Sequence, residues 1–485
     1  MNVPSSRLGT PFGRDNPGVV LRIELDSPPA PSDALKRLAG LPGRVLLESA
    51  GEEGTFSFVA ADPIAVLRSS GGRTRVAGTG AMEDAEPLAD PFAGLDFLLA
   101  RWHMPPPSDG VSFAGGVIGF LGYEAGDYLE HLPPSRPNDL GIPDAWFGVY
   151  DSAVVWDRNR GSCAAVASVL PGRTKEETVA RLERLAERVR VPGAASRSME
   201  GSKSRAPSPV APGTSSLERD AFLAGVERIR EYIRAGDLFQ ANLTRRLTVQ
   251  TAMSGTELYG AMVEASPAPY AAYLDCGDAE VASISPELFL SLRGRGIATS
   301  PIKGTRPRGR TTEEDEVLRR DLAGSDKDRA ENVMIVDLLR NDLSRVSLPG
   351  SIAVSRLATV ETHPTVHHLV STVTGRLGPD KTIMDLLRAT FPGGSVTGAP
   401  KIRAMEILRE LEPVRRGVYT GALGILGFHG DAELSVAIRT AVLRDGRAHY
   451  GTGGGITLAS NPEAEWAETE DKARAFLQAI SPGWG

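Results

Sequence analysis

The chain has 485 residues, of which 24% are charged, and its formal net charge is −7. This length allows a large buried core and suggests two or three domains or one large α/β unit, while the acidic balance argues against a nucleic-acid partner. No segment approaches the ~18 apolar residues of a membrane span, and residues 1–18 lack the apolar region of a secretory signal. We therefore expect a cytoplasmic protein with no membrane partner.

The two cysteines, Cys163 and Cys276, lie far apart and form no metal-binding or redox motif. This usage fits a reducing compartment. Neither cysteine has a histidine beside it in the sequence, so we do not expect a cysteine nucleophile.

Residues 18–190 mix short strand-like runs with glycine turns. Residues 44–49 and 57–60 are predicted strands. Residues 114–124 contain too many glycines for a stable helix, which favours a buried, closely packed strand. A helix over Lys175–Arg190 is expected to close this N-terminal part.

Residues 191–216 are rich in serine, proline, glycine and alanine and contain scarcely a large apolar side chain. Such a composition is typical of an exposed, flexible linker. It divides the chain into an N-terminal region, residues 18–190, and a C-terminal region, residues 217–483.

The C-terminal region is expected to open with a helix that ends at Gly236, with Ser215 and Glu218 as a capping box. Its elements come in clusters rather than in strict alternation, which favours an α+β fold with largely antiparallel sheets. The further predictions are strands over residues 270–274, 281–285, 288–293, 418–428 and 434–442, a long helix over 313–343, a glycine loop over 450–456 and a final helix over 462–480.

Lys303 is a lone lysine in the apolar, glycine-turned segment 300–309. Burial and nearby cations lower the pKa of a lysine and can make its neutral amine a nucleophile. The alternative is an ordinary surface lysine at the end of a strand.

Two acidic pairs each share one face of a predicted helix: Asp328 with Glu331, and Glu465 with Glu468. Carboxylates from two half-buried helices suit a hard cation such as Mg²⁺. The competing interpretation is a solvated helix face on which Glu468 pairs with Lys472.

Three further features could contact a substrate. Arg439 lies among small residues in the alternating segment 434–442, which suits a guanidinium that grips a carboxylate, although a surface-facing arginine is equally consistent. Residues 450–456 could offer backbone N–H groups to an anion or form a plain turn. One of His367 and His368 could transfer a proton or polarise a group, or both could be structural.

Seven segments together resemble the chorismate-utilising enzyme family, and the resemblance covers nearly the whole chain. It implies a fold like that of anthranilate synthase component I, with large, mostly antiparallel β-sheets packed as a sandwich and helices on the outside. The segments are residues 236–243, 285–289, 300–309, 328–342, 367–371, 391–401 and 464–469.

Two positions distinguish the branches of that family. Relatives that add water to chorismate carry a lysine base where this chain has Gln240, which cannot deprotonate water, so ammonia is the better nucleophile here. Anthranilate synthases usually carry alanine where this chain has Lys303. The resemblance is therefore to the aminodeoxychorismate branch, in which this lysine attacks ring carbon C2 as the C4 hydroxyl leaves and ammonia then adds at C4. The product, 4-amino-4-deoxychorismate, leads to p-aminobenzoate and folate. An anthranilate synthase and a non-catalytic protein that binds tryptophan or an amidotransferase remain alternatives.

The resemblance also implies roles for individual residues. Lys303 would be the nucleophile, Glu287 the general acid for the departing hydroxyl, and His368 an assisting group nearby. Mg²⁺, which eases loss of the hydroxyl, would be bound by Glu331 and Glu468 with Glu465 close by. The substrate site would be lined by Gln240, Gly304, Thr305, Tyr419, Arg439, Gly453, Gly454 and Gly455.

The resemblance implies a partner and a second site. We find no glutaminase in the chain, so we expect a separate glutamine amidotransferase subunit that supplies ammonia in a heterodimer. Relatives bind tryptophan in a pocket to which Ser49, Pro269 and Tyr270 correspond here. Residues 266–270 differ from the Asn-Pro-Ser-Pro-Tyr motif of feedback-sensitive relatives. We therefore do not expect feedback control by tryptophan, although tryptophan could still bind.

Overall fold

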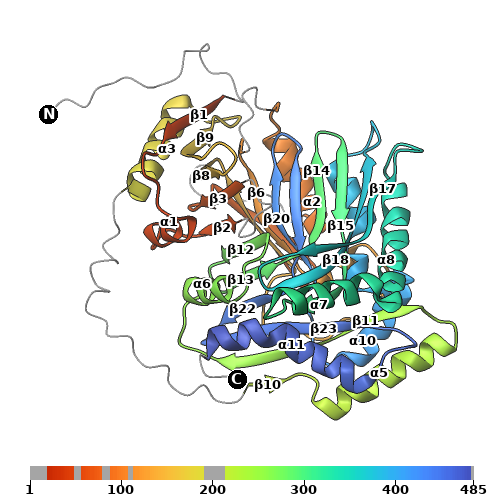
Figure 1. The fold of residues 1–485 in the computed structure, drawn as a ribbon. Helices are drawn as coiled ribbons and strands as arrows, with labels where there is room; N and C mark the ends of the chain where they lie inside the picture. The colour runs from red at the N-terminus through yellow and green to blue at the C-terminus, as the bar shows by residue number, and fades with distance from the viewer. Residues whose placement is uncertain (1–18, 49–55, 79–87, 107–112, 191–212, 482–485) are drawn as a thin grey trace.

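The computed structural model describes residues 19–48, 56–78, 88–106, 113–190 and 213–481. Two large β-sheets form the centre of the molecule, and their neighbouring strands run antiparallel (Figure 1). Both faces of each sheet are covered, either by the other sheet or by helices. The predicted α+β sandwich with helices on the outside is therefore confirmed.

The larger sheet joins the N-terminal strands to the strands that carry much of the candidate site. In spatial order its described strands are β1 (Val20–Glu24), β9 (Ser162–Ser168), β8 (Ser152–Asp157), β3 (Phe56–Ala60), β2 (Val45–Glu48), β12 (Tyr270–Asp275), β13 (Glu280–Ser285), β22 (Thr440–Arg444), β23 (Arg447–Ile456), β11 (Gln240–Gln250) and β10 (Thr214–Ser215), with β19 (Gly398–Ala399) also paired to β11.

The smaller sheet likewise combines strands from both ends of the chain. In spatial order its described strands are β16 (Ile302–Pro307), β18 (Val366–Arg376), β15 (Gly296–Ser300), β14 (Leu288–Arg293), β21 (Ala432–Val436), β20 (Ala422–Gly427), β6 (Gly116–Leu121), β7 (Ala145–Tyr150), β4 (Ala65–Ser70) and β5 (Arg73–Gly78), with β17 (Ala353–Thr362) also paired to β18.

Helices cover the outer faces of the two sheets, as Figure 1 shows for α3 and α6 on one sheet and α8 on the other. The described helices are α1 (Pro31–Arg37), α2 (Pro91–Arg101), η1 (Tyr123–Tyr128), α3 (Lys175–Arg190), α5 (Arg219–Arg234), α6 (Gly255–Ala265), α7 (Thr312–Gly324), α8 (Asp326–Ser344), α9 (Ile383–Thr390), η2 (Gly394–Val396), α10 (Lys401–Leu411) and α11 (Pro462–Ile480).

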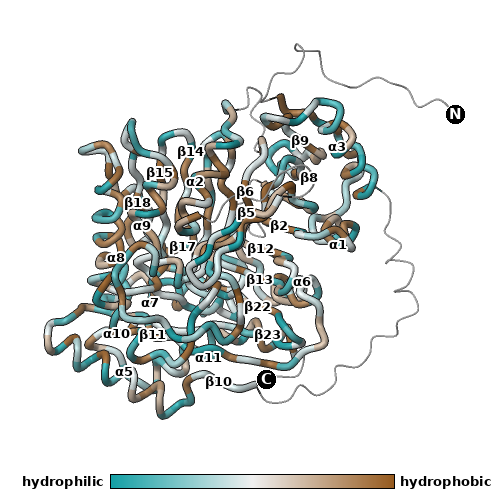
Figure 2. Tube along the Cα trace, turned by 180° about the vertical axis from the view of Figure 1, so that it is seen from behind, coloured by the Kyte–Doolittle hydropathy of each residue, from teal (hydrophilic) through white to brown (hydrophobic). Residues whose placement is uncertain are grey.

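Alternating side chains of the central strands feed two different apolar cores. In β12, Ala272 and Leu274 pack between the two sheets, whereas Ala271 and Tyr273 face the helices. This period of two is the geometry of a strand that is buried on both sides. The same burial makes many strands, such as β6, hydrophobic along their length, while the exposed helix α3 alternates between polar and apolar residues (Figure 2).

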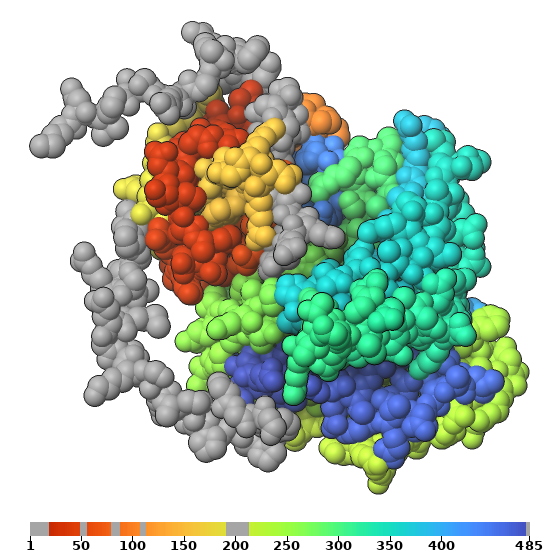
Figure 3. Space-filling view, in the orientation of Figure 1, coloured from red at the N-terminus to blue at the C-terminus, as the bar shows by residue number. Residues whose placement is uncertain are grey.

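The N-terminal and C-terminal regions share both sheets. β2 of the N-terminal region pairs with β12, and β6 pairs with β20. The space-filling view accordingly shows the early and late parts of the chain packed as one body (Figure 3). Most of the predicted linker, residues 191–212, lies outside the described residues, so the division of the chain at this point remains a prediction.

The prediction of one long helix over residues 313–343 is wrong. It is two helices, α7 and α8, separated at Ser325. The Ser325 side chain accepts a hydrogen bond from the Asp328 backbone N–H, which is the geometry of a helix N-cap, so this serine starts a new helix rather than continuing the old one.

The predicted strand over residues 434–442 is also divided, because the chain passes from one sheet to the other. β21 lies in the smaller sheet and β22 in the larger. Between them Arg439 has a φ of +51°, a left-handed conformation that breaks the strand. Residues 450–456 are not a loop but part of β23, which pairs with β11 along its whole length.

Two smaller predictions are corrected. The capping box does not form, because Ser215 lies in β10 and its hydroxyl donates to the Leu217 carbonyl. The glycine-rich strand ends at Leu121, and the predicted 418–428 strand begins only at Ala422. The predicted helices Lys175–Arg190 and Pro462–Ile480 are confirmed. Within the described ranges, no helix combines the length and apolar character needed to cross a bilayer.

Candidate active site

The predicted site residues come from both sheets and meet where β11 and β23 of the larger sheet approach β16 of the smaller sheet, between α8 and α11. In Figure 1, β11, β23 and α11 lie in the lower part of the molecule, with α8 above them. An ion-pair contact joins the two helices, since the Lys327 ammonium on α8 lies 3.6 Å from the Glu465 carboxylate on α11.

Lys303 is directed into this site by a β-bulge. The register of β16 against β18 shifts between Ile302 and Thr305, so Lys303 and Gly304 lie in the irregularity. Gly304 has a φ of +85°, and a Cβ there would come within 2.9 Å of the Asp328 side chain, so only glycine fits. The Lys303 Nζ then donates a hydrogen bond to the Ser395 backbone carbonyl at 2.8 Å.

The surroundings of Lys303 favour its neutral form. Burial lowers the pKa of this amine, and the nearby Lys472 lowers it further. The carboxylates of Glu287, Glu331 and Glu468 act in the opposite direction, but the net pKa is below that of an ordinary lysine. A half-buried amine with a lowered pKa meets the requirement for a lysine nucleophile.

Glu287 immediately precedes β14, with only 4% of its surface exposed. Its Oε1 accepts a hydrogen bond from the Ser395 hydroxyl at 2.5 Å. Burial raises the pKa of this carboxyl to about 7, although Ser395 and the two lysines, Lys303 and Lys472, oppose that rise. A carboxylic acid that keeps its proton near neutral pH is suited to protonate a leaving group.

His368 lies on β18 beside the lysine-bearing strand. Its Nδ1 is 2.9 Å from the Thr305 hydroxyl, and the side chain is buried. Burial, together with Arg439 and His363, lowers the pKa of the His368 imidazole well below its usual value. A neutral imidazole can exchange hydrogen bonds with a hydroxyl group without adding charge to the site.

Gln240 is completely buried, and neither its amide oxygen nor its amide nitrogen has a hydrogen-bond partner among the described residues. A Cβ on Gly455 would lie 2.3 Å from the Gln240 Nε2 and 3.7 Å from the Lys303 Nζ, so the amide and the amine lie beside the same glycine. Buried polar groups are normally bonded, so an orphaned amide at this place favours a bound polar ligand.

Two strained turns bring Tyr419 and Arg439 together. Thr420 and Arg439 both have left-handed φ values, +62° and +51°. Such conformations cost on the order of 1–3 kcal/mol each and cluster at functional sites. The two turns are bonded through Ala437, whose carbonyl accepts from the Thr420 N–H at 2.8 Å.

The Arg439 guanidinium is half-buried, and burial lowers its pKa. No acidic side chain in the described part of the chain forms an ion pair with it. An arginine of this kind can bind the carboxylate of a ligand.

The glycines of β23 allow close packing and leave one strand edge open. Tyr419 packs on Gly451, where a Cβ would come within 2.2 Å of the ring. β22 pairs with β23 only as far as Tyr450, so the edge beyond this point, which includes Gly453 and Gly455, has no strand partner within the described residues. Because alternate residues of an antiparallel strand point to opposite edges, amides of this segment can meet an anion.

The carboxylates of Glu331, Glu465 and Glu468 also gather here. Lys327 lies 3.8 Å from Glu331 and 3.6 Å from Glu465, and a Cβ on Gly454 would lie within 3.5 Å of both Glu465 and Glu468. No compact group of three metal-ligating side chains is found in the described part of the chain. The buried Oε1 of Glu331 nevertheless has no hydrogen-bond donor there. On α11 the Glu468 carboxylate is paired with Lys472 at 2.6 Å, as the competing interpretation expected. Because Mg²⁺ is usually held by one or two carboxylates and substrate oxygens, the oxygens of these residues are still of the type that a magnesium ion binds.

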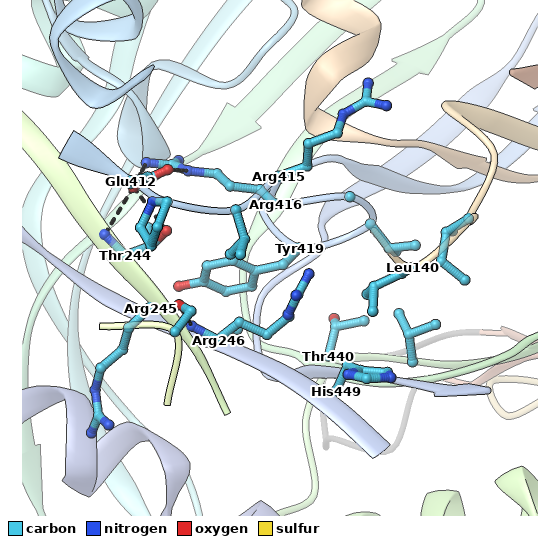
Figure 4. A pocket seen from close by; sticks show the side chains of 18 residues that line it. Leu140, Thr244, Arg245, Arg246, Glu412, Arg415, Arg416, Tyr419, Thr440 and His449 are labelled. Atoms are coloured by element: carbon cyan, nitrogen blue, oxygen red, sulfur yellow. Dashed lines mark hydrogen bonds and ion pairs between the residues drawn. The ribbon is translucent and has the colours of Figure 1, made fainter. Parts of the chain in front are cut away.

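A pocket of about 30 Å³ adjoins the site beneath Tyr419 (Figure 4). Glu412 accepts hydrogen bonds there from the Thr244 N–H and hydroxyl at 2.9 and 2.8 Å. It is also paired with the buried Arg416 at 2.7 Å. This ion pair holds the segment that carries Tyr419 and, through a 2.8 Å bond to the Val396 carbonyl, the neighbouring turn η2.

The predicted tryptophan pocket is separate from this site. Pro269 and Tyr270 line two adjoining cavities of about 40 and 350 Å³, together with Phe56 and Phe58. Ser49 lies outside the described residues, so the predicted pocket cannot be assembled in full. Two residues that flank predicted site positions are held elsewhere: Asp328 pairs with Arg306, and His367 with Asp315.

Ser395 contacts both Lys303 and Glu287, and the sequence analysis does not single it out. The only signal for it is its place inside the segment 391–401, where serine is flanked by glycines and small residues. Apart from the tryptophan-pocket residues, the other predicted site residues lie in the elements that surround Lys303, and their roles remain predictions.

Three comparisons relate this site to known proteins. The model of the "chorismate binding enzyme" family matches residues 43–478. The chain is 38% identical to the anthranilate synthase component 1 of Pseudomonas putida, over 92% of this chain and 91% of that protein. It is also 38% identical to the aminodeoxychorismate synthase component 1 of Bacillus subtilis, over 90% of this chain and 91% of that protein.

The crystal structure of anthranilate synthase component I from Streptococcus pneumoniae has a similar fold, with a TM-score of 0.77, 33% identity and coverage of 87% of this chain and 92% of that one. Relatives under two enzyme names thus match equally well, so identity does not choose between their products. With a matching family model over most of its length, the chain belongs to the family of chorismate binding enzymes.

Proposed function

We propose that this protein is the chorismate-aminating component of an aminodeoxychorismate synthase. It replaces the C4 hydroxyl of chorismate with ammonia and forms 4-amino-4-deoxychorismate. The observation that carries this proposal is the placement of Lys303: its amine is half-buried, has a lowered pKa and is bonded to the same residue, Ser395, as the candidate acid Glu287.

The reaction would proceed through two displacements. The neutral Lys303 amine attacks ring carbon C2, both conjugated ring double bonds shift by one position towards C4, and the C4–O bond breaks as Glu287 donates its proton, so that water leaves. Ammonia then adds at C4, both double bonds shift back, and the C2–N bond to Lys303 breaks. The ammonium proton lost from the product returns to the Glu287–Lys303 pair, which restores the starting state.

The surrounding residues support this sequence of events. Arg439, Tyr419 and the open edge of β23 can hold the carboxylates of chorismate, and the His368–Thr305 pair can contact its hydroxyl. Glu331 and Glu468, with Glu465 close by, would hold Mg²⁺, which neutralises the ring carboxylate when bound. The orphaned amide of Gln240 offers ammonia a hydrogen-bond acceptor and no base that could activate water.

Ammonia would come from a separate glutamine amidotransferase subunit. Both relatives named above are component 1 of their synthases. A second component is therefore part of the proposal for this chain as well. Ammonium salt should replace that partner in the test tube at alkaline pH.

The test is the identity of the product formed from chorismate, Mg²⁺ and ammonium salt by the purified chain. We expect 4-amino-4-deoxychorismate, and direct formation of anthranilate would refute the assignment. Lys303→Ala should lower the rate of the para product by at least about 10³-fold. The exposed Lys175→Ala on α3 serves as the control that leaves it unchanged. An undiminished para product from Lys303→Ala would exclude the covalent step.

A further inference from the structure

Ser395 contacts the two groups on which the proposed reaction depends, through two different parts of the residue. Its backbone carbonyl accepts from the Lys303 Nζ at 2.8 Å, and its hydroxyl donates to the Glu287 Oε1 at 2.5 Å. The residue is 6% exposed, so water does not compete for these bonds.

The turn that carries Ser395 is held rigidly from both sides. Arg416, which is buried and paired with Glu412, donates to the Val396 carbonyl at 2.8 Å. On the other side Gly394 lies under Leu338 of α8, where a Cβ would come within 2.5 Å of that side chain. The Thr397 hydroxyl closes the turn by donating to the Gly393 carbonyl at 3.0 Å. The backbone of Ser395 is therefore held in place beside Glu287 and Lys303.

A hydrogen bond from a fixed hydroxyl makes the two oxygens of a carboxyl group unequal. When the group is protonated, its carbonyl oxygen is the better acceptor and its hydroxyl oxygen is the donor. The Ser395 hydroxyl occupies Oε1 of Glu287, which favours Oε1 as the carbonyl oxygen and Oε2 as the oxygen that carries the proton. The Ile302 backbone N–H also favours the ionised carboxyl, and it remains in every Ser395 variant. After the proton has left, the same bond stabilises the carboxylate that remains.

We propose that Ser395 is a positioning residue that fixes the transferable proton of Glu287 on Oε2, facing the departing hydroxyl, while its carbonyl holds the Lys303 amine beside the acid. The proposal rests on the use of Glu287 as the acid. It does not depend on the position of amination, because water leaves from C4 whether the amine enters at C2 or C4.

The test compares Ser395→Ala, which removes the hydroxyl and keeps the carbonyl, with Ser395→Thr, which keeps both. Total consumption of chorismate is followed with ammonium salt, so the readout is the same for either aminated product. We expect Ser395→Ala to lower kcat by about 10–100-fold with a change in KM for chorismate below about threefold, and Ser395→Thr to keep most of the activity.

The pH profile separates this role from a purely structural one. The charged groups that face Glu287 are Lys303 on β16 and Lys472 on α11, and both remain in the variants. Loss of the hydroxyl removes a bond that favours the carboxylate, so the alkaline limb of kcat/KM should move to higher pH by about one unit in Ser395→Ala. It should stay in place in Ser395→Thr.

Ser435→Ala is the matched control, because this buried hydroxyl on β21 donates to the Leu423 carbonyl and touches no candidate catalytic group. The alkaline limb of the kcat/KM profile should not move in this control variant. An unmoved limb or an unchanged kcat in Ser395→Ala would overturn the proposal. If the alanine variant does not fold, Ser395→Cys, with a weaker donor of similar size, should give a smaller shift in the same direction, and no shift would again overturn it. The identity of the wild-type product tests the proposed function separately.

Discussion

Replacing Glu287 with glutamine should stabilise the protein at alkaline pH, because the buried carboxyl resists ionisation. Its pKa rises from 4.5 to about 7 on folding. Between these values the unfolded chain releases the proton and the folded chain keeps it, so the wild-type protein loses stability as the pH rises from about 4.5 to 7. The whole difference corresponds to about 3 kcal/mol. Glutamine does not titrate and can still accept the Ser395 hydrogen bond.

The assay is thermal unfolding of the wild type and Glu287→Gln at several pH values. For a chain of 485 residues, 3 kcal/mol corresponds to a rise in Tm of about 3 °C, using about 2.1 cal/mol/K of unfolding entropy per residue. We expect this difference at pH 8 and almost none at pH 4.5. The control is Glu264→Gln, an exposed carboxylate on α6, which should show no pH-dependent gain. Equal Tm differences at both pH values would refute the reasoning that burial keeps Glu287 protonated.

Two further predictions concern the substrate and the metal. Arg439→Ala should raise the KM for chorismate by about 10–100-fold, because a charge-assisted bond is worth about 1.5–3 kcal/mol. Steady-state kinetics measures this KM, and an unchanged value would show that Arg439 does not bind the substrate. Chelation of Mg²⁺ should abolish turnover, and Glu331→Gln should raise the Mg²⁺ concentration needed for half-maximal rate by at least about tenfold, whereas the exposed Asp337→Asn on the same helix should not. An equal Mg²⁺ requirement in both variants would contradict the assignment of Glu331.

Much of the fold could be predicted because burial leaves a period in the sequence. The helix Pro462–Ile480 is predicted at its observed bounds, and the structure shows that Asn461 caps its N-terminus and Pro462 is its first residue. The division of residues 434–442 between two sheets could not be predicted, because both halves keep the same alternation. The alternation is interrupted only at Arg439, whose backbone is left-handed, and no neighbouring residue type in the sequence marks this conformation.

The candidate site shows the same limit. Glu465 and Glu468 could be paired in advance, because a spacing of three fixes them on one helix face. The glycines of residues 450–456 predict a loop, but they lie in a strand, where they admit Tyr419 and Gln240 at close range. The place of Ser395 in the glycine-rich segment 391–401 does not indicate what it contacts. Its importance comes from contacts with residues about a hundred positions away, and only tertiary structure supplies them.

The central claim is that the Lys303 amine forms a bond to the ring of chorismate. The most direct measurement is mass spectrometry of the wild-type protein, quenched with chorismate and Mg²⁺ in the absence of ammonia. We expect a mass increase equal to chorismate less one water, located on the peptide that contains Lys303, and loss of the adduct when ammonium is added. An unmodified Lys303 peptide from an enzyme that forms product once ammonium is supplied would contradict it.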